Sequence, residues 1–249
     1  MRAGRYELLE VVGEGATGVV YRAAGDVAVK VLRGADPVTV RRFAREAHIA
    51  RGLASRHLVP VLDVGHDYVV MPFFERGSLA GALPLPLDDV VRLAAEIAQA
   101  LDALHEAGIV HRDVKPSNVL LGAEGAALGD FGLARGADST QLTRDGQLVG
   151  TAHYLAPELI EGAVATPASD VYAFACLLYE AATGAPPFAG RNEAEIGYAH
   201  LVEDPPRPNL PGAVADAILL GLEKEPGDRP TTATALARML RLASTSSPA

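Results

Sequence analysis

The chain has 249 residues, of which 49% are hydrophobic, and this is enough for one large domain or for two lobes that share a cleft. Its 22 Lys and Arg stand against 31 Asp and Glu, and this net charge of −9 argues against a general affinity for nucleic acid or an anionic membrane. The single cysteine, Cys176, excludes an internal disulfide and fits a reducing compartment such as the cytoplasm.

The sequence predicts no membrane segment and no secretion signal. The apolar run VYAFACLLY (171–179) is well short of the roughly 20 residues that a membrane helix needs, and it predicts a buried helix around Cys176. The opening MRAGRYELLE has no apolar signal-peptide core. We therefore expect a cytoplasmic segment that contacts no membrane.

The first third of the chain is predicted to form short strands with one helix among them. The helix begins at Asp36 and Pro37, an N-cap followed by proline in the first turn, and apolar residues then recur at helical spacing as far as Ala50. Runs rich in β-branched residues predict the strands. These runs are residues 6–13, 19–24, 26–32, 58–65 and 68–74.

From Asp88 onward the pattern is helical. Thr166 and Pro167 begin one helix that Gly184 ends, and the closing STSSPA (244–249) is predicted to be a tail or linker. The predicted helices are residues 90–108, 166–184, 192–203, 213–223 and 231–242. The order of elements predicts an α+β fold, with a small antiparallel β-rich lobe that contains one helix and a larger, mainly helical lobe.

A glycine-rich run, GEGATG (13–18), precedes the second predicted strand. Taken alone it is either an ordinary turn or a phosphate-binding loop. A dinucleotide-binding fold would place a helix directly after the third glycine, but the strand-like VVY follows, so we expect a hairpin whose bare backbone lies over phosphates. Lys30 ends the strand VAVK and is either a solvated edge residue or a phosphate ligand.

The stretch IVHRDVKPSNVLL (109–121) carries charged side chains between two apolar runs, where unpaired charge costs several kcal/mol. Individually, Asp113 and Asn118 could be turn residues, and DFG (130–132) could be an ordinary turn. Several such motifs occurring in a fixed order along the chain are much more specific than any one of them. By that order the sequence resembles the eukaryotic-type protein kinases over residues 13–229. The matching motifs are Gly13-x-Gly15-x-x-Gly18-x-Val20, Val27-Ala28-Val29-Lys30, His111-Arg112-Asp113 with Asn118, Asp130-Phe131-Gly132, and Ala156-Pro157-Glu158.

The resemblance implies a kinase that transfers the γ-phosphoryl group of ATP to Ser or Thr hydroxyls of protein substrates. Lys30 would hold the α- and β-phosphates and pair with Glu46, and Asp113 would accept or orient the hydroxyl proton. Asn118 and Asp130 would hold Mg²⁺, for which Mn²⁺ can substitute.

The resemblance also assigns the remaining parts of the site. Residues 1–74 would form the N-lobe and residues 75–243 the C-lobe. Lys115 and Thr151 would lie beside the catalytic aspartate, as in the Ser/Thr branch of the family. The residues expected to contact the nucleotide are Val12, Gly13, Glu14, Gly15, Gly18, Val20, Ala28, Lys30, Met71, Pro72 and Phe74.

A cluster of arginines predicts control by phosphorylation. Arg42, Arg112 and Arg135 would converge on the activation segment, where like charges need an anion. We expect a phosphate on Thr143, or else on Ser139, Thr140 or Thr151, added by autophosphorylation during self-association.

Three further residues are implied to be structural. Asp170 would tie down the turn at residues 111–113, and Glu158 and Arg229 would form a buried ion pair.

The alternatives to an active protein kinase are a pseudokinase scaffold, which would have lost Lys30, Asp113 or Asp130, and a small-molecule kinase, which would lack the peptide-docking segment 150–158. The Ala-rich composition and short hairpins resemble bacterial members of the family, which are often joined to a membrane anchor and sensor that this chain does not include.

The first testable prediction concerns substrate choice. Kinases that prefer arginine before the acceptor carry carboxylates where this chain has Ser117 and Ser78. A missing charge-assisted hydrogen bond is worth roughly 1.5–3 kcal/mol, or about 10-fold in kcat/KM, so we expect no strong arginine requirement two or three positions before the acceptor. A positional peptide library at physiological ionic strength measures this. A dominant arginine signal would contradict it and would point to Glu75 or Glu195.

Overall fold

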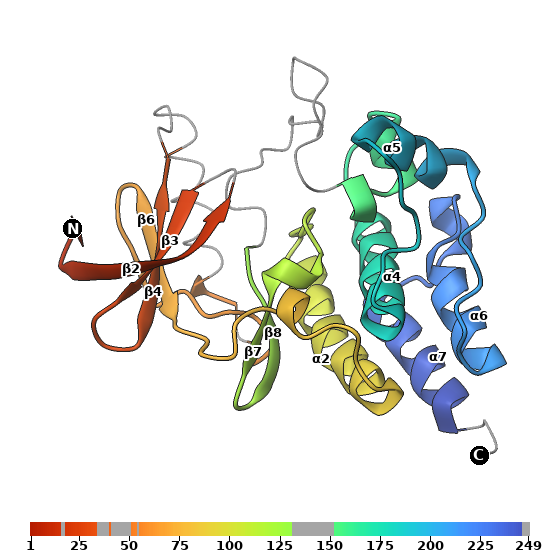
Figure 1. The fold of residues 1–249 in the computed structure, drawn as a ribbon, viewed down its shortest axis with the longest axis horizontal. Coiled ribbons are helices and arrows are strands. Elements are labelled where there is room, and N and C mark those ends of the chain that lie inside the picture. The colour runs from red at the N-terminus through yellow and green to blue at the C-terminus, as the bar shows by residue number, and fades with distance from the viewer. Residues whose placement is uncertain (16–17, 34–39, 41–50, 54, 131–151, 246–249) are drawn as a thin grey trace.

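The computed structural model describes residues 1–15, 18–33, 40, 51–53, 55–130 and 152–245. A curled antiparallel sheet comes first and a larger, mainly helical body follows, with a short two-stranded hairpin between them (Figure 1). This is the α+β layout that the sequence predicts. None of the helices in the described ranges is both long enough and apolar enough to cross a membrane.

The sheet has six strands in the order β1-β2-β3-β4-β6-β5, and each pairs with its neighbour in antiparallel fashion. Four of the five predicted strands are confirmed as β2, β3, β4 and β6. The strands are β1 (Arg2–Ala3), β2 (Tyr6–Gly15), β3 (Gly18–Ala23), β4 (Val27–Leu32), β5 (Asp63–Val64) and β6 (Tyr68–Pro72).

The predicted strand 58–65 is wrong in its extent, because only Asp63–Val64 forms a strand. Pro60 has no N–H to donate to a ladder and interrupts the segment. Leu58 instead makes a single parallel bridge to Leu128, and the Val59 amide donates to the Leu128 carbonyl at 2.9 Å. This part of the chain is therefore attached to the hairpin rather than to the sheet.

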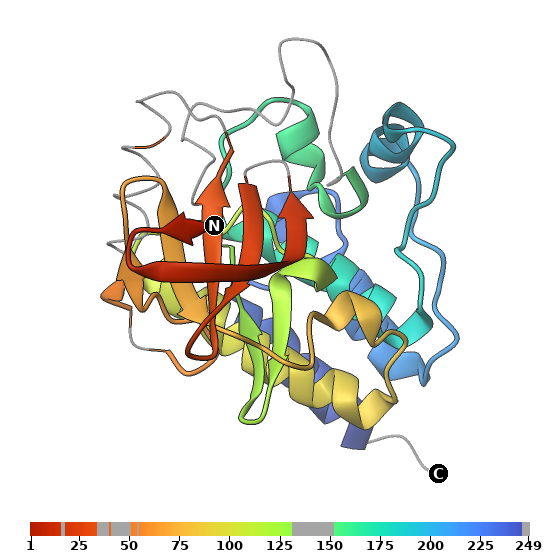
Figure 2. The same ribbon diagram turned by 60° about the vertical axis from the view of Figure 1, so that its left-hand side comes forward.

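The two edges of the sheet approach each other. Asp63, on edge strand β5, accepts hydrogen bonds from the Arg5 guanidinium at 3.0 Å and from the Tyr6 hydroxyl at 2.8 Å, and both donors follow edge strand β1. The sheet is consequently curled, as Figure 2 shows from the side of the N-terminus. Arg5 and Asp63 thus close the sheet around its own small core.

The glycine-rich run lies in a β-hairpin, as predicted, with Gly15 opposite Gly18. A Cβ atom on Gly18 would lie 2.2 Å from the Val31 carbonyl oxygen of β4, so a side chain at this position would force the strands apart. Glycine is required here by the close approach of β3 to β4. Residues 16–17 at the tip lie outside the described ranges.

The helical body is built around α4, which is largely apolar and mostly buried, with Cys176 inside it. Burial raises the pKa of the Cys176 thiol, in keeping with its predicted structural role. Gly184, at φ 84°, ends α4 as predicted. The helices are α2 (Leu87–Glu106), α3 (Pro157–Ile160), α4 (Pro167–Thr183), α5 (Glu193–Val202), α6 (Gly212–Gly221) and α7 (Ala233–Thr245).

The sequence pattern missed one β-element in the part of the chain that it predicted to be helical. Strands β7 (Val119–Gly122) and β8 (Gly125–Leu128) form a tight hairpin against α2, where the Glu96 carboxylate accepts the Ala126 amide at 2.8 Å. Helix α7 also continues two residues into the predicted tail. The helix predicted from Asp36 lies almost wholly outside the described residues.

A buried ion pair joins the segment before α7 to α3. The Arg229 side chain is 0% exposed, and its guanidinium donates to both carboxylate oxygens of Glu158 at 2.8 Å. Its remaining N–H groups donate to the carbonyls of Ala168, Glu223 and Lys224. All five guanidinium donors are therefore used.

The Glu158–Arg229 pair also makes stability depend on pH. Burial is the largest single influence on Glu158 and opposes its ionisation, but the hydrogen bonds and charge of Arg229, a backbone hydrogen bond and the Ser169 side chain together outweigh it and hold the pKa of this carboxyl below its usual value of 4.5. A lowered folded-state pKa contributes stability that is complete above the unfolded pKa and is lost as the pH falls through the folded one.

We predict that Arg229→Met lowers the free energy of unfolding by about 3–5 kcal/mol, because it leaves Glu158 partly buried and unpaired. The control is Arg191→Met, which removes another arginine–glutamate pair, with Glu195, whose arginine is 89% exposed. We expect no measurable change from the control. Urea denaturation at pH 7 gives both values, and equal losses in the two variants would contradict the prediction.

Candidate active site

The residues 111–113, here called the catalytic turn, are held by one buried carboxylate. Asp170, on α4 and 1% exposed, accepts the amide of His111 at 2.7 Å and the amide of Arg112 at 2.8 Å. Its Oδ2 also contacts Nε2 of His105, at the end of α2, at 2.8 Å. Arg112 has a φ of 66°, a left-handed conformation that costs energy for a non-glycine residue. The two hydrogen bonds from the backbone amides to Asp170 stabilise this conformation.

His111 fixes the same turn from inside. Its Nδ1 accepts the Asp113 amide at 3.2 Å, so the ring must be protonated on Nε2, which donates to the Gly129 carbonyl at 3.0 Å. Burial lowers the pKa of His111, which keeps the imidazole neutral. The neutral ring connects the catalytic turn to the residue before Asp130.

The Asp113 carboxylate lies between two polar side chains. Its Oδ2 is 3.0 Å from the Lys115 ammonium and accepts from the Asn118 amide nitrogen at 3.0 Å. The same nitrogen donates to the Asp113 carbonyl at 2.7 Å. Both N–H groups of the Asn118 amide therefore face Asp113, which leaves the amide oxygen to act as a ligand.

The hairpin β7–β8 brings the two predicted metal ligands together. Asn118 directly precedes β7 and Asp130 follows β8, so antiparallel pairing places both at the open end of the hairpin. The Gly129 amide donates to the Asn118 carbonyl at 2.8 Å and closes this end. Carboxylate and amide oxygens suit a hard divalent cation, so the two residues fit a Mg²⁺ site.

Lys30 reaches Asp130 from the sheet. Its side chain is 9% exposed, and its Nζ lies 2.7 Å from Oδ1 of Asp130. Asp130 has a φ of 57° and a side chain that is 36% exposed. The ion pair crosses from the sheet to the hairpin and brings a cation and an anion to one point between them.

Four predicted nucleotide contacts share one face of the sheet. Val20 lies opposite Lys30, and Ala28 lies opposite Met71, on adjacent strands. Because residues 28 and 30 point to the same side of β4, their partners do so too. Val20, Ala28, Lys30 and Met71 therefore form one surface, on the side from which Lys30 contacts Asp130.

The other predicted contacts flank this surface. Pro72 ends β6, and Phe74 follows it, with its carbonyl accepting from the Gly77 amide at 3.0 Å. Val12 and Gly13 lie at a register shift in β2. The Glu14 side chain pairs with Arg33 at 3.1 Å, so its expected contact with a nucleotide falls to the backbone.

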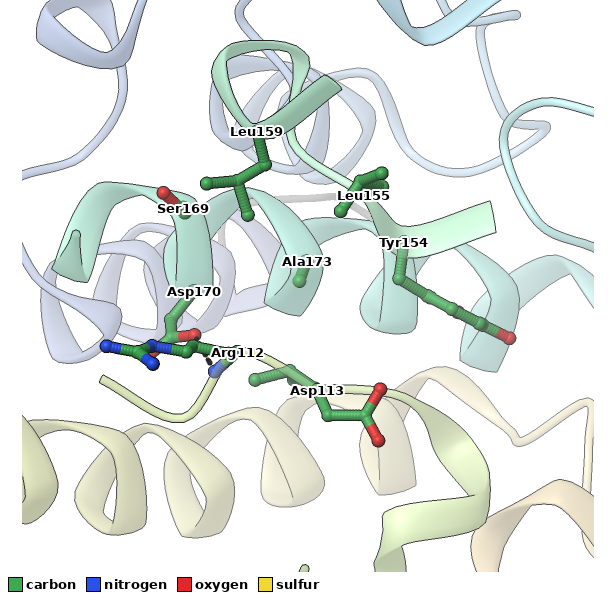
Figure 3. A pocket seen from close by; sticks show the side chains of 9 residues that line it. Arg112, Asp113, Tyr154, Leu155, Leu159, Ser169, Asp170 and Ala173 are labelled. Carbon is green, nitrogen blue, oxygen red and sulfur yellow. Dashed lines mark hydrogen bonds between the residues drawn. The ribbon is translucent and has the colours of Figure 1, made fainter. Parts of the chain in front are cut away.

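A small cavity lies between the catalytic turn and side chains of α3, α4 and the segment before α3 (Figure 3). Leu155, Leu159 and Ala173 lie across it from Arg112 and Asp113. Its remaining lining residues are Val114, Tyr154, Ser169 and Asp170. None of the predicted nucleotide contacts lines it, so this cavity is distinct from the surface formed by Val20, Ala28, Lys30 and Met71.

Several predicted site residues lie outside the described ranges. They are Glu46, Thr151, Arg42, Arg135, Ser139, Thr140 and Thr143. The pairing of Lys30 with Glu46 and the arginine cluster around a phosphate therefore stay predictions. Arg112 is the described member of that cluster.

Sequence reasoning missed two histidines that support the site. His105 contacts Asp170, and His57, which is 1% exposed, contacts the Ala126 carbonyl of β8 through Nδ1 at 2.9 Å. Neither belongs to a motif with a known spacing. The available signal was a histidine beside apolar residues, which more often marks an ordinary core position.

The chain belongs to the protein kinase domain family, whose family model matches residues 6–240. Membership implies the use of ATP and a divalent metal ion. The chain is 38% identical to serine/threonine-protein kinase PknB of Mycobacterium leprae, over 92% of this chain and 41% of that protein. It is also 38% identical to the DNA damage-responsive serine/threonine-protein kinase RqkA of Deinococcus radiodurans, over 97% of this chain and 40% of that protein.

Solved structures agree with the fold. The kinase domain of Mycobacterium tuberculosis PknI matches with a TM-score of 0.76 and 26% identity, over 98% of each chain. The expected bilobal kinase fold and the likeness to bacterial members are thus confirmed. The chain spans about two fifths of the length of the curated relatives it matches.

Proposed function

We propose that this chain is the catalytic domain of a cytoplasmic serine/threonine protein kinase. The observation that carries the proposal is the convergence of Asp113, Asn118 and Asp130 around the hairpin, with Lys30 contacting Asp130 from the sheet at 2.7 Å. These residues come from both parts of the fold. Their juxtaposition supplies a proton acceptor, metal ligands and a phosphate-binding cation at one place.

Each residue has a definite part in phosphoryl transfer. Asp113 orients the substrate hydroxyl and accepts its proton, while Lys115 and Asn118 keep its carboxylate in position. Lys30 binds the α- and β-phosphates when these replace or share its contact with Asp130. The glycine hairpin covers the phosphates with backbone, because side chains are absent at Gly13, Gly15 and Gly18.

Asn118 and Asp130 would hold Mg²⁺ through oxygen atoms. A divalent ion bound there would neutralise charge on the oxygens of the transferred phosphoryl group. Mn²⁺ prefers similar ligands and can substitute.

The two alternatives are less well supported. A pseudokinase scaffold has no use for the ordered contacts among Lys30, Asp130 and Asp113, which are all present. A small-molecule kinase does not need the segment around Tyr154 and Leu155, which follows the activation segment and lies beside the catalytic turn.

The test of the function uses Asp113→Asn and Lys30→Met. We expect kcat for a Ser/Thr peptide to fall by about 10²–10⁴ in Asp113→Asn, because the proton acceptor is lost, and Lys30→Met to be similarly inactive. The assay follows phosphate transfer from Mg·ATP by mass spectrometry. Asp88→Asn makes the same chemical change at an exposed position on α2 and should leave kcat unchanged. An Asp113→Asn protein that keeps most of the wild-type kcat at a matched melting temperature would overturn the assignment.

We also propose that autophosphorylation of Thr143 activates the domain. A phosphate of about −1.5 to −2 charges would gather Arg42, Arg112 and Arg135. Two or three charge-assisted bonds of roughly 1.5–3 kcal/mol each reach the approximately 5.5 kcal/mol needed to shift a segment from 1:99 to 99:1.

We predict that phosphatase treatment or Thr143→Ala lowers activity about 10-fold or more. Thr234→Ala, an exposed threonine on α7, is the matched control and should have no effect. Peptide phosphorylation rates before and after incubation with Mg·ATP give the measurement. The switch is disproved if neither treatment changes the rate.

A further inference from the structure

Residues 72–74, which begin at the last residue of β6 and are here called the hinge segment, are hydrogen-bonded to the tight turn between β3 and β4. The Phe73 amide donates to the Asp26 carbonyl at 2.9 Å, one step beyond the Val27–Pro72 pair. The turn reaches this position because Gly25 and Asp26 have φ values of 89° and 54°. In a longer turn, nothing would oblige the Asp26 carbonyl to lie within hydrogen-bonding distance of the Phe73 amide.

This bond determines which hinge groups remain for a nucleotide base. Pro72 has no N–H, and the Phe73 N–H is directed to Asp26. The next amide along the chain is that of Phe74. The pair of groups available to a base is therefore the Pro72 carbonyl and the Phe74 amide, as the sequence predicts.

Arg22 holds the same hinge segment through its side chain. Its guanidinium carbon lies 4.7 Å from the centre of the Phe73 ring, a cation–π contact. Its Nη1 lies 3.8 Å from Oε1 of Glu10, its cross-strand partner on β2, and its Nη2 lies 3.9 Å from Oδ1 of Asp26. Arg22 thus joins the strand that leads into the glycine hairpin, the β3–β4 turn and the hinge segment.

The contact with the ring is the stronger part of this junction. The nitrogen–oxygen distances of both ion pairs are near the upper limit for a salt bridge, and the Glu10 and Asp26 side chains are largely exposed. Each ion pair therefore contributes little to stability. At a partly exposed site, a planar guanidinium over an aromatic ring keeps more of its interaction free energy than an ion pair does. Removing the stack should therefore free the hinge segment without unfolding the sheet.

We propose that Arg22 is a positioning residue for nucleotide binding, which acts by stacking on Phe73. The stack keeps the Pro72 carbonyl and the Phe74 amide directed toward the base. This proposal rests on the proposed function, because it assumes that a nucleotide occupies the surface formed by Val20, Ala28 and Met71. Arg22 lies between the glycine-rich motif, which ends at Val20, and the motif that begins at Val27, and it belongs to neither.

The experiment measures the Kd of a fluorescent ADP analogue together with KM for ATP and kcat. Arg22→Gln should raise Kd and KM about threefold, the size of one such contact, and leave kcat at saturating ATP unchanged. Arg22→Lys should recover part of the loss, because an ammonium also interacts with a ring but cannot stack. Arg2→Gln is the matched control, an exposed arginine on β1, and should change neither quantity.

A double-mutant cycle distinguishes positioning from a general loss of structure. Phe73→Leu removes the ring and should also raise Kd about threefold. The Arg22→Gln/Phe73→Leu protein should show an increase in Kd no larger than that of either single variant. A combined effect of about ninefold, or an unchanged Kd in Arg22→Gln, overturns the proposal. A wild-type protein that binds the analogue but transfers no phosphate refutes the proposed function and leaves the cycle to decide on Arg22. A wild-type protein that binds no nucleotide refutes both.

Discussion

The buried carboxylate of Asp170 is the fixed point on which the site depends. An ionised group that is 1% exposed must be compensated by donors, and His105 with the amides of His111 and Arg112 provides them. These bonds stabilise the left-handed backbone at Arg112, which costs about 1–3 kcal/mol. Asp113 is the next residue, so its place follows from that of the carboxylate. The His111 ring then extends the same constraint to Gly129 and hence to Asp130.

The Glu158–Arg229 pair and the Lys30–Asp130 pair differ in a way that separates structure from function. Arg229 is fully enclosed and uses all five donors, so it has no capacity to bind anything else. Lys30 has three donors, and the described part of the chain supplies one acceptor, Asp130, whose side chain is 36% exposed. A saturated pair stabilises a fold, whereas an unsaturated and accessible pair can exchange one partner for a phosphate. Partial satisfaction near solvent is therefore what the chemistry of the site requires.

The sequence predicted the long periodic elements and the residues within ordered motifs, and it failed where neither signal exists. The strands around Lys30 and helix α2 have clear periodicity, but the four-residue strands of the β7–β8 hairpin are too short to show a period. The predicted strand 58–65 is too long because its apolar composition indicates a strand, whereas Pro60 has no N–H to donate to a ladder. No sequence spacing predicts that Lys30 pairs with Asp130. The order of the motifs indicates only that the two residues belong to one site. His57 and His105 act through contacts between distant segments, which composition does not encode.

The distances along the chain that the site spans determine when it can form during synthesis. Arg5 and Asp63 are 58 residues apart, so the sheet can close early, whereas Lys30 and Asp130 are 100 residues apart. At roughly 5–20 residues per second, a ribosome needs about 5–20 s to pass from the lysine to the aspartate. The catalytic turn needs longer, because its anchor, Asp170, is made after both. A nascent or prematurely terminated chain that stops before α4 consequently has a closed sheet but no fixed catalytic turn, and incomplete copies of the protein are expected to be inert.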